Sequence, residues 1–133
     1  MSVSVLVGTW RLISGEVLDD AGSVAIEMTD GMLHYAPSGH MCAQLVVSAR
    51  APGSKLHRAV GDFIAYFGTY SVSEELHTVT HRIEGGYGCY SPGRTLVRSY
   101  EIEDDVLFLR ASLAEQSSVP LGTTGIAVWE RAA

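Results

Sequence analysis

The chain has 133 residues, of which 47% are hydrophobic and 18% charged, and its formal net charge is −6. This length favours one domain over residues 1–133, and the hydrophobic share is too high for a disordered chain. The negative charge argues against a nucleic-acid partner, and no apolar run reaches the roughly 20 residues that cross a bilayer. We therefore expect a soluble, cytoplasmic, single-domain protein with no nucleic-acid or membrane partner.

The motifs of metal and cofactor sites are missing from the sequence. Cys42 and Cys89 are too few for a disulfide scaffold or a closed thiolate metal site. The histidines show neither H-x-H nor H-E-x-x-H spacing, and there is no phosphate-binding loop and no G-x-S-x-G nucleophile motif. We therefore expect neither a metal nor another cofactor.

Most of the chain alternates between apolar and polar residues, which is the period of β-strands. The segments are rich in Val, Ile, Thr and Tyr, and the short links between them favour antiparallel pairing. Asp30-Gly31 is a hairpin signal between two of them. In chain order the predicted strands are Gly8 to Leu18, Val24 to Met28, Met32 to Ala36, His40 to Ser48, Phe67 to Ser73, Leu76 to Gly85, Thr95 to Ile102, Val106 to Ser112 and Thr123 to Arg131.

Two segments interrupt this pattern. Apolar residues between Ser54 and Tyr66 recur at the spacing of an amphipathic helix, and Pro52-Gly53-Ser54 supplies a break and an N-cap. One short helix beside eight to nine strands favours an all-β, antiparallel, up-and-down barrel with one end plugged by the helix. The stretch Gly85 to Gly93 is either a long hairpin loop or a gate over a cavity mouth that carries Tyr87.

Two polar side chains, whose burial costs free energy, are predicted inside this barrel. His81 and Arg98 each share a strand face with apolar residues. A small barrel can hold one ligand, and these groups would then be its polar contacts. The alternative is purely structural: Arg98 pairs with an internal carboxylate such as Glu16, and His81 is a satisfied core histidine.

Further residues are predicted on the same inward faces or at the cavity mouth. Tyr70 points inward by the alternation of its strand, and the strand after His40 has its better apolar face on Met41 and Leu45. The residues expected to contact a ligand are Tyr66, Tyr100, Met41, Leu45, Phe63 and Tyr87.

An ordered set of short motifs resembles the lipocalin-like domain family along nearly the whole chain. The motifs are Gly8-Thr9-Trp10-Arg11-Leu12, Gly39-His40-Met41, Tyr66-Phe67-Gly68-Thr69-Tyr70, Thr78-Val79-Thr80-His81, Arg98-Ser99-Tyr100 and Val128-Trp129-Glu130-Arg131. The resemblance implies a lipocalin-like barrel in which Trp10 closes the bottom and Arg131 packs on it as a cation–π pair. It also implies small-molecule binding and, for members that resemble natural-product enzymes, cofactor-free cyclase or isomerase chemistry.

Two functions remain open at this point. The first is a cofactor-independent cyclase or isomerase that acts on a small, apolar, polyketide-like substrate. His81 would be its general acid or base, Arg98 would stabilise a carboxylate or enolate, Tyr70 and Tyr100 would donate hydrogen bonds, and Glu16 is a second acid–base candidate. The second is a non-catalytic carrier that sequesters a small hydrophobic acidic ligand. Unpaired strand edges at a barrel opening would allow a homodimer.

Overall fold

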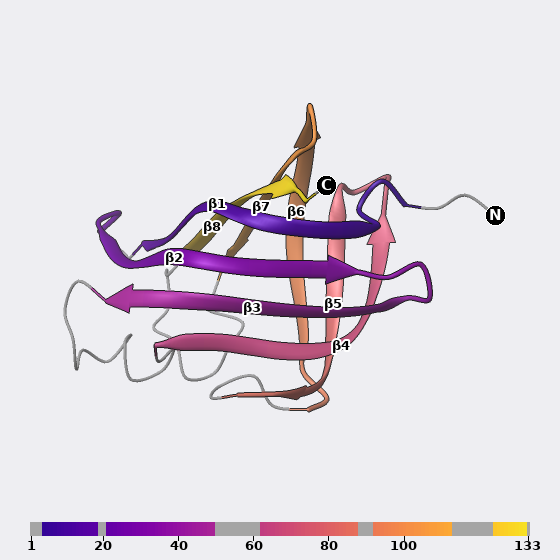
Figure 1. Cartoon of the computed structure of the whole chain (residues 1–133), viewed down its shortest axis with the longest axis horizontal. Coiled ribbons are helices and arrows are strands. Elements are labelled where there is room, and N and C mark those ends of the chain that lie inside the picture. The colour runs from indigo at the N-terminus through magenta and orange to yellow at the C-terminus, as the bar shows by residue number, and fades with distance from the viewer. Residues whose placement is uncertain (1–3, 19–20, 50–61, 88–91, 113–123, 133) are drawn as a thin grey trace.

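The protein folds into one closed barrel of eight antiparallel strands in chain order (Figure 1). The computed structural model describes residues 4–18, 21–49, 62–87, 92–112 and 124–132. The strands are β1 (Gly8–Leu18), β2 (Val24–Tyr35), β3 (His40–Ala49), β4 (Phe63–Ser73), β5 (Thr78–Gly86), β6 (Thr95–Glu103), β7 (Val106–Ser112) and β8 (Thr124–Arg131). The predicted all-β, up-and-down barrel is thereby confirmed. Because β8 pairs with β1, the open edge that motivated the homodimer is not present.

The predicted turn at Asp30-Gly31 is wrong, and this reduces nine predicted strands to eight. β2 runs straight through it, with an irregularity in its pairing to β3 between Met28 and Asp30. The Asp30 carboxylate accepts hydrogen bonds from the Arg11 side chain of β1 (3.0 Å to Nε) and from the Gly31 backbone (2.8 Å). The Asp-Gly pair therefore marks a bulge in a continuous strand, where an extra residue bends the chain without reversing it.

The predicted helix is wrong over the part of it that the structure describes. Phe63 to Tyr66 belong to β4, where Ile64 and Tyr66 are buried while Phe63 is 41% exposed. Both faces of this strand carry apolar side chains, so the sequence imitates a helical stripe. Phe63 points away from the interior and does not line a cavity, contrary to expectation. The rest of the predicted helix lies within residues 50–61, outside the described residues.

A shift within β1 changes which of its residues face inward. Its register with β8 is irregular in the middle of the strand, so Trp10 is buried before the shift and Val17 after it. Glu16 is consequently exposed. The predictions of Glu16 as an internal acid or base and as the partner of Arg98 are therefore wrong.

The end of the barrel where β1 begins and β8 finishes is closed by a tryptophan and an arginine. Trp10 is completely buried and donates its Nε1–H to the carbonyl of Leu6 (2.9 Å). The Arg131 guanidinium lies 4.2 Å from the centre of the Trp10 ring and donates to the carbonyls of Val7 (2.9 Å) and Val5 (3.0 Å). The predicted cation–π pair is confirmed.

Candidate functional site

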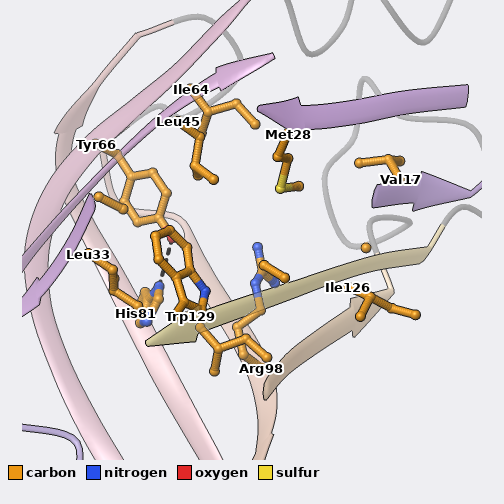
Figure 2. A pocket seen from close by; sticks show the side chains of 14 residues that line it. Val17, Met28, Leu33, Leu45, Ile64, Tyr66, His81, Arg98, Ile126 and Trp129 are labelled. Carbon is orange, nitrogen blue, oxygen red and sulfur yellow. Dashed lines mark hydrogen bonds between the residues drawn. The ribbon is translucent and has the colours of Figure 1, made fainter. Parts of the chain in front are cut away.

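The interior of the barrel contains an apolar cavity (Figure 2). The cavity has a volume of about 70 Å³, which is more than a single water molecule needs. The side chains and backbone that line it belong to Val17, Met28, Leu33, Ala43, Leu45, Ile64, Tyr66, His81, Arg98, Leu109, Gly125, Ile126, Ala127 and Trp129. The interior is therefore hollow, as a ligand-holding barrel requires.

His81 and Arg98 both project into this interior from adjacent strands. His81 in β5 is 2% exposed and Arg98 in β6 is 9% exposed. Side chains alternate across a strand, so His81 faces inward with Val79 and Ile83 while Arg82 between them faces solvent. The predicted inward orientation of the two polar groups is confirmed.

The two nitrogens of the His81 ring are each hydrogen-bonded to a tyrosine hydroxyl. The Tyr35 hydroxyl lies 2.6 Å from Nε2, and the Tyr66 hydroxyl lies 2.7 Å from Nδ1. Burial lowers the pKa of His81 from its usual value near 6.5 to about 3, and the positive charge of Arg98 acts in the same direction. The ring is therefore neutral at neutral pH and is a weak base.

The two hydrogen bonds of the neutral ring run in opposite directions, because one ring nitrogen carries a hydrogen and the other accepts one. The Tyr35 side chain is fully buried, and burial raises the pKa of its hydroxyl well above its usual value, so the hydroxyl keeps its proton. In the tautomer with the hydrogen on Nδ1, Tyr35 donates to Nε2 and the ring donates to the Tyr66 oxygen, and in the other tautomer both directions are reversed. His81 thereby orients Tyr66, which lines the cavity.

Arg98 brings a positive charge into an apolar surrounding. Its side chain extends from β6 toward the middle of the cavity (Figure 2), and Nη1 donates to the carbonyl of Val97 at 3.3 Å. No aspartate or glutamate is among the described residues that line the cavity. A permanently charged guanidinium with five N–H donors in such a place favours an anionic or acceptor-rich ligand.

Trp129 lines the cavity, but the sequence analysis did not include it among the candidate site residues. It is 2% exposed, and its Nε1–H has no hydrogen-bond partner within the described part of the chain. Gly125 and Ala127 lie four and two residues before Trp129 on β8, on the same face of the strand, and also line the cavity, where their small size leaves space beside the indole. Two small residues and a tryptophan at every second position of one strand are the signal that could have identified Trp129.

The other predicted ligand contacts divide into cavity residues and residues that pack around them. Leu45 and Tyr66 line the cavity. Met41 and Tyr100 are buried but are not among its lining residues, and the Tyr100 ring stacks on His77 at 5.6 Å.

Tyr70 supports the hydrogen-bonded tyrosine behind His81. Its hydroxyl donates to the carbonyl of Ala36 at 2.7 Å, and its ring lies 4.7 Å from that of Tyr35. Burial raises the pKa of its hydroxyl. Tyr70 packs against Tyr35 and is not among the residues that line the cavity, so its predicted contact with a substrate stays a prediction.

The predicted gate residue lies outside the cavity. Tyr87 follows β5, is 64% exposed, and donates its backbone N–H to the carbonyl of Ala65 at 2.8 Å. Tyr87 is not among the residues that line the cavity, and its contact with a ligand stays a prediction. Residues 88–91 of the predicted gate lie outside the described residues.

Other site types receive no support from the described residues. Within the described ranges, no three His, Cys, Asp or Glu side chains gather where they could hold a metal ion. A search of the same ranges finds no helix with the length and apolar character needed to span a membrane.

An eight-stranded barrel around an apolar cavity with a few converging polar groups defines a class of small barrels that hold a ligand inside. The chain belongs to the lipocalin-like domain family, whose model matches residues 7–132. The family resemblance expected from the ordered motifs is thereby confirmed. No curated protein matches the chain. A lipocalin-like barrel suggests small-molecule binding.

Proposed function

We propose that the barrel binds one small, largely apolar molecule in its cavity and that Arg98 contacts a polar oxygen of that molecule. The observation that carries this proposal is a hollow apolar interior into which a buried guanidinium projects. Burial of the apolar body of a ligand supplies affinity, and a few placed polar groups supply orientation. The small volume favours a compact molecule or a compact end of a longer one.

Methyl signals of the cavity wall provide the direct test. We expect 1-butanol, butyramide and butyrate each to shift the NMR signals of Leu45, Ile64 and Leu109 methyl groups, because all three compounds share the same apolar body. Methyl groups on the outer wall, such as those of Val46 and Val97, serve as internal controls because they are exposed. If none of the three compounds moves the cavity methyl signals, the proposed function is wrong.

A cofactor-independent cyclase or isomerase for a polyketide-like substrate is the second candidate. The observation that favours it is the chain of hydrogen bonds from Tyr35 through His81 to Tyr66. In the tautomer in which His81 Nδ1 donates to the Tyr66 oxygen, Tyr66 can present its O–H to a carbonyl or enol oxygen as a general acid. His81 would be a positioning residue in this scheme, and Arg98 would stabilise the developing enolate.

Carriage and catalysis differ in what happens to the bound molecule. We would extract the small molecule that copurifies with the protein and compare it by mass spectrometry before and after incubation with the protein. Conversion that Tyr66→Phe lowers at least about tenfold while binding is retained supports the enzyme. A molecule that is recovered unchanged supports the carrier.

A further inference from the structure

We propose that Trp129 and Arg98 together form a binding site for a carboxylate or an equivalent oxyanion of the ligand, with the indole N–H and the guanidinium donating to the same anionic group. This inference rests on the proposed function and names the polar group that the cavity recognises. It adds Trp129 as a contact that determines specificity.

The first observation is the hydrogen-bonding state of Trp129. The indole Nε1–H can only donate a hydrogen bond. It is buried and has no partner among the described residues. Buried donors are almost always paired, since a donor removed from water without a replacement costs free energy. An acceptor oxygen on a ligand would provide that replacement.

The second observation is that the polar groups around the cavity are mainly donors. Trp129 contributes an N–H, and Arg98 contributes N–H groups with a positive charge. No carboxylate lines the described part of the cavity. These donors favour an anion over a neutral acceptor, because charge-assisted hydrogen bonds are stronger than neutral ones. They disfavour a cation, because Arg98 is itself positively charged.

The third observation is the arrangement of polar and apolar walls. Figure 2 shows Trp129 and Arg98 on one side of the cavity, and Met28, Leu45 and Ile64 on the other. A ligand would therefore lie with its anionic group toward β6 and β8 and its apolar body toward β2, β3 and β4.

The indole N–H signals of the wild-type protein give the sharpest test. The chain has two tryptophans, hence two such signals in a ¹H–¹⁵N spectrum, and Trp129→Phe identifies which is which. We expect butyrate to move the Trp129 signal downfield, whereas the Trp10 signal stays in place because its N–H already donates to the Leu6 carbonyl. Butyramide and 1-butanol, which lack the charge, should move the Trp129 signal much less.

Affinities from the same titrations test the two contacts separately. We expect butyrate to bind about tenfold more tightly than butyramide, and Arg98→Met to abolish this preference. Trp129→Phe should weaken butyrate about fivefold and leave 1-butanol unchanged. Arg110→Met is the matched control, because Arg110 is exposed on the outer wall and its loss should change nothing.

The outcomes separate this inference from the proposed function. If all three compounds bind equally and the Trp129 signal does not move, the oxyanion site is wrong while the ligand-binding cavity stands. If butyrate is preferred but neither the Trp129 signal nor Trp129→Phe responds, Arg98 alone holds the anion and the role of Trp129 is overturned. If no compound moves the cavity methyl signals, the proposed function itself fails.

Discussion

The closed end of the barrel and its cavity each contain a buried tryptophan and an arginine, but the hydrogen bonding of the two places differs. At the closed end, Trp10 donates to a carbonyl and Arg131 lies over its ring while donating to two more carbonyls. In the cavity, the N–H of Trp129 has no partner among the described residues, and the Arg98 side chain projects toward the middle of the cavity. The fold satisfies the N–H of Trp10, whereas within the described part of the chain it provides no acceptor for the N–H of Trp129.

This difference shows that residue type and burial do not separate structural from ligand-binding residues. Both tryptophans are at most 2% exposed, and each belongs to one of the six motifs that carry the family resemblance. The hydrogen bonding of each buried donor separates them, because the Leu6 carbonyl accepts from Trp10 while the N–H of Trp129 has no acceptor in the described part of the chain.

The largest effect is expected at the arginine of the closed end. Arg131→Met removes the cation–π contact with Trp10 and the hydrogen bonds to the carbonyls of Val5 and Val7. We expect a loss of about 2–4 kcal/mol in the free energy of unfolding, measured by urea denaturation. Arg110→Met is the control: its guanidinium lies 5.8 Å from the Phe108 ring on the exposed wall, and its loss should cost less than about 1 kcal/mol. Equal losses in the two variants would contradict a structural role for Arg131.

A smaller effect is expected from the same substitution at the two tryptophans. Trp10→Phe and Trp129→Phe remove similar volumes, but the first also leaves the Leu6 carbonyl without its donor. We expect Trp10→Phe to be the more destabilising of the two by about 1–3 kcal/mol in urea denaturation without ligand. Should Trp129→Phe prove equally or more destabilising, its N–H would have a structural partner and the comparison between the two clusters would fail.

Over a single pH unit, the smallest effect is expected from the protonation of His81 on the cavity side. The folded barrel keeps His81 neutral down to about pH 3, whereas an unfolded histidine takes up a proton below about pH 6.5. Between these values the unfolded state binds more protons, so stability is fully present above pH 6.5 and falls as the pH is lowered. The expected slope is up to about 1.4 kcal/mol per pH unit.

His81→Gln should flatten this slope between pH 6.5 and 5, because glutamine keeps a donor and an acceptor but does not titrate. The matched control is His34→Gln on the exposed outer face of β2, which should retain the wild-type slope. A wild-type slope that persists in His81→Gln would show that another group is responsible.

Much of the fold could be predicted because strand alternation is a local property. The strand assignments for β1 and β7 match the observed bounds, and the inward orientation of His81 and Arg98 follows from counting by two within a regular strand. The same counting failed for Glu16, because the register of β1 shifts in mid-strand. It also failed for Phe63, because apolar residues occupy both faces of β4 and imitate a helix.

The all-β barrel, the family and the two inward-facing polar groups could be predicted from the sequence, since each depends on short-range pattern or on ordered motifs. The folded structure was needed to show which tryptophan has no hydrogen-bond partner among the described residues and which tyrosines contact both nitrogens of His81. Those features depend on donors and acceptors brought together from strands far apart in the chain, such as the 46 residues that separate Tyr35 from His81. A period of two residues carries no information about such pairings.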